Sequence, residues 1–288
     1  MIIHIKLYYN GKKSLEELVL REMQTRNYSP RSIDTYIHQL NEIENYYKCS
    51  IDEVNSDQVK NFLQYSITER SLSVSYINQV ISAVKILQHD VLGKSWESIR
   101  IKRPRGIKRL PVVLSKEEIK SIVETTRNLK HRAILAVIYS AGLRISEVIS
   151  LRPSDIDSDR KQVRVHGKGN KYRYTLLSEN TLNMLRMYWR AYRPLQYLFE
   201  GQKKGQPISR ETIQKVFKES CRRAGINKQA TVHSLRHSFA THLLENGVNL
   251  KIIQGLLGHS SLRTTSIYLH VTRLDLASVK SPFDEIAC

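Results

Sequence analysis

The most informative stretch of the chain is TVHSLRHSFATHLLENGVNLKIIQGLLGHSSLRTTSIYLHV, residues 231–271. It predicts three helices, over about 233–245, 249–257 and 262–270, and a glycine lies just after each of the first two. Tyr268 lies between two apolar neighbours at the spacing of an ordinary core residue. Whether this tyrosine is anything more than a core residue depends on the rest of the sequence.

Upstream of this stretch lies the clearest strand signal in the chain. Residues 161–177, KQVRVHGKGNKYRYTLL, form two alternating runs around GKGN, which predicts a β-hairpin with a glycine turn. Helical patterns surround the hairpin, and in chain order they cover about 116–127, 131–141, 144–151, 178–192 and 209–224. The sequence therefore predicts a mainly α fold with a small antiparallel β-sheet.

The first hundred residues are almost entirely helical in pattern. Four helices are predicted, over about 15–24, 30–47, 56–69 and 73–90, and the first two begin at the capping residues Ser14 and Ser29. The segment IKRPRGIKRLP, residues 101–111, has five basic residues, two prolines and a glycine, so it predicts a basic linker. We expect an N-terminal helical DNA-binding domain (1–100) and a second domain with a C-terminal tail (112–288).

The charge of the chain points to a polyanionic partner. Lysines and arginines number 46 against 27 acidic residues, which gives a net charge of +19 and a pI near 9.8. Because the basic residues are spread through foldable sequence, nucleic acid is the expected partner. The first residues do not resemble an export signal, no apolar run is long enough to span a membrane, and the three cysteines form no CxxC pair. A cytoplasmic protein is expected.

Five residues stand at positions that suggest chemistry. Arg144 and His259 each follow a helix-ending glycine, Lys168 is at the tip of the hairpin, and His233 and Arg236 share one helical face. Each one alone also has an ordinary structural explanation, such as a solvated turn lysine or a capping histidine. Together they could act on a phosphodiester.

The chemistry of these five residues leaves one role open. Two arginines can bind the non-bridging oxygens of a phosphate and neutralise charge in the transition state, a lysine can protonate the leaving oxygen, and histidines can transfer protons. No group of acidic residues has the spacing of a two-metal site, which argues against a metal-dependent nuclease. The role left open is that of the nucleophile, and Tyr268, nine residues after His259, can fill it.

Three segments carry a resemblance to a known family. Residues 231–271 resemble the C-terminal signature of the tyrosine recombinases, the phage-integrase and Xer-type family. YSAGLRISEVISLRPSDID (139–157) is similar to the first arginine box of this family, and HGKGNKYR (166–173) resembles its lysine-bearing hairpin. The resemblance covers about 110–275 with the motifs in the family's order, whereas the N-terminal bundle matches the family's core-binding domain only in outline.

The resemblance assigns a role to each candidate residue. Arg144 and Arg236 match the arginines that bind the scissile phosphate, and Lys168 matches the lysine that protonates the leaving 5′ oxygen. His233 matches a residue with acid–base and phosphate-binding roles, His259 matches the residue that supports the phosphate, and Tyr268 matches the nucleophile. All six positions hold residues that the family accepts, so the resemblance implies an active enzyme.

The sequence departs from the family pattern in two places. Leu269 stands where a small polar residue is frequent, and the start MIIHIKLYYNGKK is longer and more strand-like than usual. Neither departure affects the predicted chemistry. Around the nucleophile, we expect Ile267 and Leu269 to anchor the segment while Tyr268 faces the two arginines.

The resemblance also implies a reaction and an assembly. Tyr268 would attack the phosphodiester, form a 3′-phosphotyrosyl link and release a 5′-hydroxyl, without ATP, a metal or another cofactor. A monomer or weak dimer in solution would form a tetramer on two DNA sites, with a Holliday-junction intermediate.

The apolar tail after Tyr268 could pack on its own domain or on a neighbouring protomer, and the sequence does not choose between the two. The expected DNA contacts are basic residues of the linker and hairpin: Lys102, Arg103, Arg105, Lys108, Arg109, Lys171 and Arg173.

Several alternatives remain at this stage. A type IB topoisomerase would use the same tyrosine, arginines and lysine to relax supercoils as a monomer. A DNA-binding regulator without catalysis is a second alternative, although the six intact residues argue against it. Within the recombinases, the divergent N-terminus favours an element-borne enzyme of integration, excision or transposition over an Xer-like resolvase of chromosome or plasmid dimers. Accessory directionality proteins are possible partners.

Overall fold

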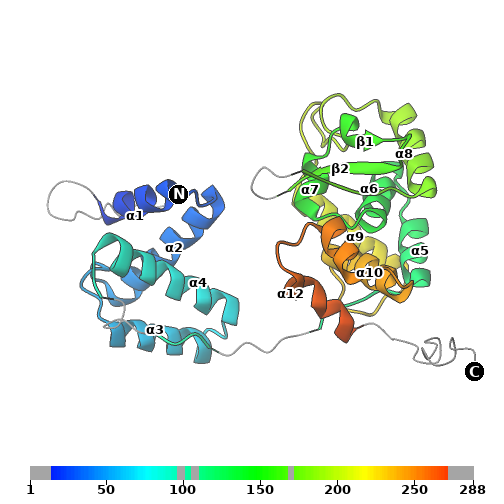
Figure 1. Ribbon diagram of the computed structural model, residues 1–288. Helices are drawn as coiled ribbons and strands as arrows, with labels where there is room; N and C mark the ends of the chain where they lie inside the picture. Colours follow the sequence, from blue (N-terminus) through cyan, green and yellow to red (C-terminus); the bar gives the residue numbers. More distant parts are fainter. Residues whose placement is uncertain (1–13, 96–100, 105–109, 168–171, 272–288) are drawn as a thin grey trace, which may run out of the picture. The chain divides into compact units, whose positions relative to one another are not determined.

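The computed structural model describes residues 14–95, 101–104, 110–167 and 172–271. The chain divides into two compact units, Met1–Lys108 and Arg109–Cys288, and each has its own hydrophobic core (Figure 1). The division falls inside the segment 101–111, where prolines and a glycine interrupt the helical sequence.

The N-terminal unit is a bundle of helices. In chain order these are α1 (Leu15–Thr25), α2 (Pro30–Tyr47), α3 (Ser56–Thr68) and α4 (Val74–Lys85), and a π-helical turn, Ile86–Val91, extends α4. Each α-helix begins after a residue whose side chain accepts a hydrogen bond from the first turn, namely Ser14, Ser29, Asn55 and Ser73. The core between the helices includes fully buried Met23, Ile43, Val59 and Val80. The predicted helical bundle is confirmed.

The C-terminal unit is mainly helical and carries one small sheet (Figure 1). Its elements are α5 (Lys116–Thr125), α6 (Leu129–Ser140), α7 (Ile145–Ser150), a 3-10 turn (Pro153–Asp155), β1 (Ile156–Asp157), β2 (Gln162–His166), β3 (Tyr172–Leu176), α8 (Glu179–Tyr192), α9 (Arg210–Arg223), α10 (Val232–Glu245), α11 (Leu250–Leu257), α12 (Leu262–Thr265) and a 3-10 turn, η4 (Ser266–His270). The predicted fold class is confirmed. One element differs, because the helix expected over 262–270 is a single α-turn followed by 3-10 helix.

The sheet is antiparallel in the order β1-β2-β3, and its register gives β3 two different faces. Val163 pairs with Thr175 and Val165 pairs with Arg173. Thr175 and Arg173 therefore point inward with the buried valines of β2, while their neighbours along β3 are exposed. The inward face of β3 supplies one of the side chains of the site described below.

Two separate hydrophobic clusters lie inside the C-terminal unit. The main cluster includes most of α6 and the inner faces of α5, α8 and α9. A smaller cluster contains Phe239, Ala240, Ile253, Leu257 and Tyr268. The segment that carries Tyr268 is therefore attached through α10 and α11 and contributes nothing to the main cluster.

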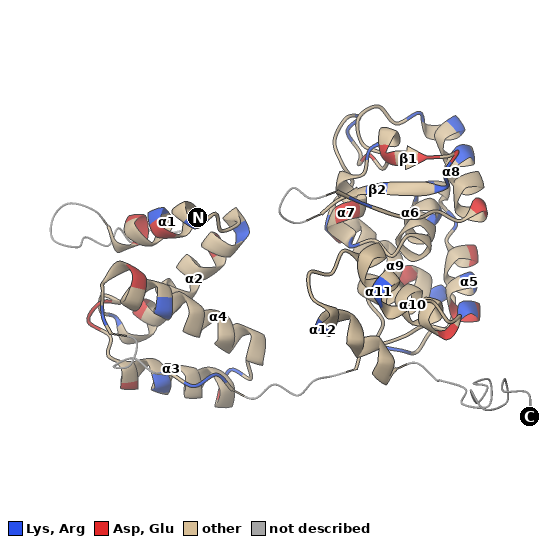
Figure 2. Cartoon of the chain, viewed as in Figure 1, with Lys and Arg blue, Asp and Glu red and all other residues tan. Residues whose placement is uncertain are grey.

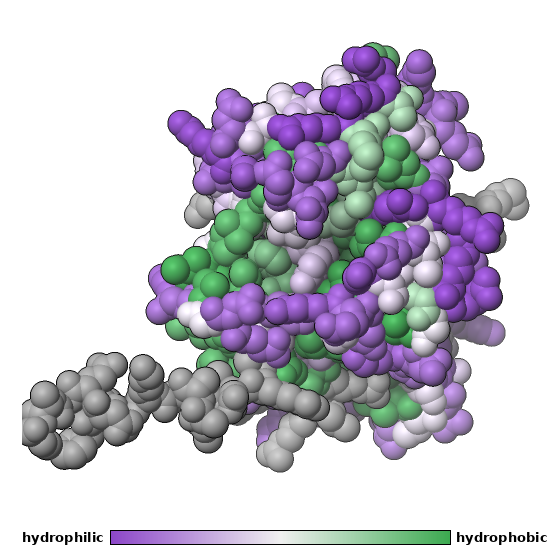
Figure 3. Space-filling model, turned by 90° about the vertical axis from the view of Figure 1, so that its right-hand side faces the viewer, coloured by the Kyte–Doolittle hydropathy of each residue, from purple (hydrophilic) through white to green (hydrophobic). Residues whose placement is uncertain are grey.

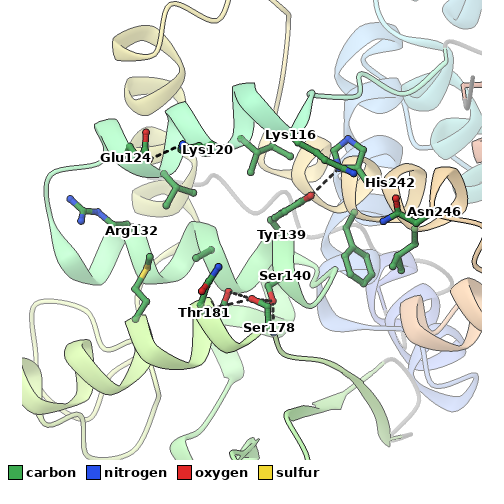
Figure 4. Close-up of a pocket in the computed structure, with 17 residues that line it drawn as sticks. Lys116, Lys120, Glu124, Arg132, Tyr139, Ser140, Ser178, Thr181, His242 and Asn246 are labelled. Carbon is green, nitrogen blue, oxygen red and sulfur yellow. Dashed lines mark hydrogen bonds and ion pairs between the residues drawn. The ribbon is translucent and has the colours of Figure 1, made fainter.

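The surface of the C-terminal unit combines interspersed charges with apolar areas. Basic and acidic residues are scattered over the unit (Figure 2), and an apolar band crosses one face (Figure 3). Residues of α5, α6, α8 and α10 line a pocket of about 530 Å³, in which Tyr139 Oη and His242 Nδ1 are 2.9 Å apart (Figure 4). No helix in the described ranges is both long and apolar enough to cross a membrane.

Candidate active site

Arg144 owes its position to a glycine turn. Gly142 ends α6 with φ +60°, a conformation that glycine adopts without strain, and a Cβ there would lie 2.6 Å from Phe239 Cε1. The turn places Arg144 at the N-cap of α7, where its backbone N–H donates to Glu147 Oε2 at 2.8 Å. The guanidinium donates to Glu147 Oε1 at 2.8 Å and remains about one-third exposed, at 34%. Part of it is therefore free to meet a ligand.

Arg236 is the buried counterpart of Arg144. It lies on α10, is 2% exposed, and donates to the backbone oxygens of Gly142 at 2.6 Å and Leu257 at 2.7 Å. Its Nη2 also lies 3.0 Å from His259 Nε2. Burial and then the nearby Arg144 lower the pKa of Arg236, although an arginine this basic still carries its proton at neutral pH. Arg144 and Arg236, which we call the clamp, are thus held by Glu147 and by fixed backbone oxygens, respectively.

Glu147 is the carboxylate around which the clamp is built. It lies on α7, 6% exposed, and its two oxygens accept from Arg144 and from both Nη atoms of Arg173, while Arg236 Nη1 is 3.7 Å away. Burial opposes its ionisation, but Arg173, Arg144 and Arg236 outweigh burial and lower the pKa of Glu147. Three guanidinium groups thus face one carboxylate, which leaves an excess of positive charge for an anion.

The contacts of His259 fix its tautomer. Arg236 can only donate, so the Nε2 atom of His259 must accept, and the proton is on Nδ1, 2.9 Å from Thr265 Oγ1. Burial, followed by the charges of Arg236 and Arg144, lowers the pKa of His259 to about 4. His259 is therefore neutral at pH 7 and joins α10 to the segment that carries Tyr268.

Tyr268 is buried beside the clamp. It is 1% exposed, and its Oη lies 3.1 Å from Nδ1 of His237, a residue that the sequence analysis did not select. Burial raises the pKa of Tyr268, and the charges of Arg236 and Arg144 partly oppose this rise. His237 stands next to Arg236 in the sequence. This position alone does not identify it as a site residue, because its contact with Tyr268 depends on how the last segment folds.

The expected anchoring of this segment is partly wrong. Leu269 is 44% exposed and does not anchor anything, whereas Ile267 is half-buried against the small cluster. Tyr268 itself is the buried residue of the three. The 3-10 geometry of η4 turns the tyrosine inward and its successor outward, which an α-helical pattern did not predict.

His233 stands at the rim of the site. It lies one turn before Arg236 on α10, its side chain is exposed, and its ring is 5.7 Å from that of His237. Partial desolvation, Arg236 and Arg144 lower the pKa of His233. The structure therefore brings together Arg144, His233, Arg236, His259 and Tyr268, while Lys168 lies outside the described residues.

A cleft of about 990 Å³ opens in front of this cluster. Its lining includes Arg144, Glu147, Arg173 and His259, together with His166 and Tyr172 of the hairpin. Tyr268 is not among the residues that line it. Arginines and aromatic side chains thus line the same cleft, which suits a nucleic-acid strand.

The predicted DNA contacts fall into three groups. Lys102 is exposed, and Arg103 donates to the Asn78 backbone oxygen and to Ser82 of α4, within the N-terminal unit. Arg173 is not the exposed basic residue that the sequence suggested, because its guanidinium is bound to Glu147. The remaining residues lie outside the described ranges: Arg105, Lys108, Arg109 and Lys171.

Comparisons with known proteins agree with this fold. Residues 112–274 match the model of the phage integrase family, and residues 15–98 match the model of the phage integrase N-terminal SAM-like domain. The chain therefore belongs to the phage integrase family, the tyrosine recombinases, which are enzymes of site-specific recombination.

Individual relatives cover almost the whole chain. A putative integrase/recombinase, y4qK of Sinorhizobium fredii, is 36% identical over 272 residues, which cover 94% of this chain and 88% of that protein. The tyrosine recombinase XerD of Staphylococcus saprophyticus is 32% identical, over 81% of this chain and 84% of its own.

Solved structures show the same fold. The Tn1549 transposon integrase bound to circular-intermediate DNA has a TM-score of 0.72 at 18% identity and covers 94% of this chain and 99% of its own. The XerH recombinase bound to difH DNA has a TM-score of 0.71 at 24% identity, over 96% of this chain and 86% of its own.

Proposed function

We propose that this chain cuts and rejoins DNA strands through a covalent bond between Tyr268 and a scissile phosphate. The observation that supports this proposal most directly is that the clamp and Arg173 converge on one carboxylate, Glu147, beside a tyrosine. Such a cluster carries more positive than negative charge, and a phosphodiester, with one negative charge, suits it. The relatives named above are described as a putative integrase/recombinase and a tyrosine recombinase, which supports this proposal.

The clamp would act on charge that develops during the reaction. When Tyr268 Oη attacks phosphorus, the P–O5′ bond breaks and the non-bridging oxygens gain charge in the transition state. Arg144 and Arg236 are held by Glu147, Gly142 and the end of α11, so they need little reorganisation to stabilise that charge. A bound phosphate would also raise the pKa of His259 by adding an anion, and His259 could then donate to it.

Proton transfer would be shared among the remaining residues. The phenol proton leaves Tyr268, for which His233 is the acceptor that the family resemblance assigns. Lys168, at the predicted tip of the hairpin, would protonate the 5′ oxygen as it leaves. The 5′-hydroxyl of a partner strand then attacks the phosphotyrosine, the bond to Tyr268 breaks, and the number of phosphodiesters is conserved.

The biological setting is a second part of the proposal. Two relatives described as putative integrases or recombinases, at 36% and 39% identity, support an element-borne enzyme of integration, excision or transposition. The XerD relatives, at 30–32%, support dimer resolution as the alternative. We propose a cytoplasmic protein that assembles as a tetramer on two DNA sites. A lambda integrase of similar fold forms a tetramer bound to a Holliday junction.

The first prediction concerns the nucleophile. On a nicked duplex carrying the recombination site, the wild-type chain should form a covalent protein–DNA adduct, and Tyr268→Phe should form none because it lacks the attacking oxygen. The variant should bind the same duplex with unchanged affinity. Denaturing gel electrophoresis measures the adduct, and a filter or fluorescence assay measures binding.

A matched control is available in Tyr139. Its hydroxyl also pairs with a histidine, His242, at 2.9 Å, in the pocket lined by α5, α6, α8 and α10 (Figure 4). Tyr139→Phe removes the same kind of hydrogen bond and should leave adduct formation intact. An adduct from Tyr268→Phe would refute the proposed nucleophile, and relaxation of a plasmid that lacks the site would indicate a topoisomerase instead.

A further inference from the structure

Arg173 occupies an unusual place for a residue of a basic hairpin. Its side chain points inward from β3 and is only 12% exposed. Nη1 and Nη2 each donate to one oxygen of Glu147, at 2.8 and 2.9 Å, and Nε donates to the backbone oxygen of Leu256 at 2.8 Å. The two parallel bonds to Glu147 form the bidentate pairing that an arginine makes best.

The chain leaves room for this side chain at Gly258. Gly258 has φ +63°, and a Cβ there would lie 2.8 Å from Arg173 Cδ and 3.1 Å from Arg173 Nε. Any other residue would therefore meet the guanidinium stem as well as the strain of the left-handed backbone. The turn that leads to His259 is thus shaped around Arg173.

Arginines also bind the last carbonyls of α11. Leu256 O accepts from Arg173, and Leu257 O accepts from Arg236 at 2.7 Å and from Arg144 at 3.4 Å. These carbonyls have no partner inside the helix, so the guanidinium groups satisfy them. Through these bonds Arg173 connects three elements: β3, α7 and the end of α11.

We propose that Arg173 is a positioning residue of the clamp and does not itself bind the phosphate. This inference rests on the proposed function. While Arg173 occupies both oxygens of Glu147, that carboxylate has only part of its acceptor capacity left for Arg144. Without Arg173, Glu147 would turn fully to Arg144 and Arg236, offset one of their two positive charges, and draw them away from the cleft. The turn at Gly258, and with it His259, would also lose its support.

The test uses two substrates that differ in one charge. One is a nicked duplex carrying the recombination site, and the other is the same duplex with a neutral methylphosphonate at the scissile position. A neutral group needs little help from the clamp, so a defect that acts through the clamp should shrink on it. Adduct formation is measured in single turnover for the wild type, Arg173→Lys and Arg173→Gln.

The expected result separates positioning from binding. On the phosphodiester, both variants should form the adduct about 10- to 100-fold more slowly, the size of effect typical when supporting residues or geometry are lost. DNA affinity should stay within about twofold of the wild type, since a single positioning residue contributes little to binding. On the methylphosphonate, the variants should approach the wild-type rate.

Arg164→Gln is the matched control. Arg164 belongs to β2 of the same sheet, but its side chain is 43% exposed and pairs with Asp155. Arg164→Gln should form the adduct at the wild-type rate on both the phosphodiester and the methylphosphonate substrate. A loss of affinity that parallels the loss of rate in Arg173→Lys would show a phosphate contact and overturn the inference, as would an equal defect on both substrates.

A double-variant comparison gives a second reading of the same role. Glu147→Gln removes the carboxylate, so Arg173 keeps only its bond to Leu256 O at the end of α11. Adding Arg173→Gln to Glu147→Gln should therefore slow adduct formation much less than Arg173→Gln slows it in the wild type, and independent, multiplying effects would overturn the inference. If the wild type formed no adduct on its site, the proposed function would fail, whereas a normal wild type with normal Arg173 variants would refute only this role.

Discussion

At the residue scale, the pair formed by His237 and Tyr268 defines the resting state of the nucleophile. Burial, followed by His233 and Arg236, lowers the pKa of His237 to about 4, while burial raises that of Tyr268 above its ordinary value near 10. Moving the phenol proton to this imidazole is therefore strongly unfavourable, because burial weakens both the acid and the base. His237 therefore holds a neutral hydroxyl in place and is a poor acceptor for its proton.

This argument predicts the effect of replacing His237. His237→Phe removes the hydrogen bond between His237 and the hydroxyl of Tyr268. The hydroxyl is then held less firmly in one orientation, so the adduct should form about 10- to 100-fold more slowly. His237→Asn retains a hydrogen-bonding group close to the position of Nδ1 and should recover part of the rate. Single-turnover adduct formation at pH 7 measures both.

His242→Phe is the control for this prediction. It removes the histidine of the other Tyr–His pair, with Tyr139, which lies in the pocket lined by α5, α6, α8 and α10. The rate of adduct formation by His242→Phe should match that of the wild type. If His237→Phe reacted at the wild-type rate or faster, the hydrogen bond to Tyr268 would have no positioning role.

At the element scale, the turn after α6 is the junction that brings the clamp together. Gly142 ends the helix, its backbone oxygen accepts from Arg236 at 2.6 Å, and Arg144 follows two residues later. Phe239 of α10 packs directly over Gly142. One residue thus sets the distance between α6 and α10 and the position of both arginines.

We therefore expect Gly142→Ala to be strongly destabilising. The new methyl group meets the ring of Phe239, and the positive φ adds strain of about 1 kcal/mol, so the variant should lose roughly 2–4 kcal/mol of unfolding free energy. Chemical denaturation followed by circular dichroism measures the loss.

Gly225 provides the matched comparison, since it also ends a helix at positive φ, +68°, but has nothing within 4 Å of an added Cβ. Gly225→Ala should show only the backbone strain, about 1 kcal/mol. Equal losses in the two variants would mean that contact with Phe239 contributes nothing.

The last segment shows where an element escapes prediction. Thr265 binds His259 through its hydroxyl, and Ser266 Oγ donates to the backbone oxygen of Arg263, so both hydroxyls have local partners that compete with a regular helix. The α-turn therefore changes to 3-10 helix at Ser266. A pattern of apolar residues cannot distinguish these two geometries over a single turn.

At the scale of the whole molecule, the excess of basic residues determines how DNA is held. A net charge of +19 over 288 residues favours many phosphate contacts, each of which releases counterions. Affinity for duplex DNA should fall about 10³-fold or more between 50 and 200 mM salt, as for proteins that make six or more such contacts. Titration of a labelled duplex at several salt concentrations measures the slope.

Tyr268→Phe should show the same slope, because a hydroxyl that forms no phosphate contact in the resting state does not release counterions. A change in affinity of less than about threefold over this range would contradict the electrostatic argument. The comparison also separates DNA binding from covalent attachment, which would otherwise increase the apparent affinity of the wild type.

Much of this protein could be read from its residues alone. The helical bundle, the hairpin and the mainly α fold followed from capping residues, glycine stops and alternating runs, because these are local signals. Arg144, His233, Arg236, His259 and Tyr268 were selected by residue type and motif, and the structure places them together. Sequence patterns also identified the family to which the chain belongs.

Contacts between distant segments could not be read in this way. No sequence pattern singled out Glu147 or His237, and Arg173 was expected among the DNA contacts. The bonds Arg173–Glu147 and His237–Tyr268 join residues 26 and 31 positions apart, and no local pattern encodes such pairs. The sequence thus determined which chemical groups are present, whereas the packing of α7, β3, α10 and η4 determined which of them face each other, since a buried charge or hydroxyl takes the partner that folding places beside it.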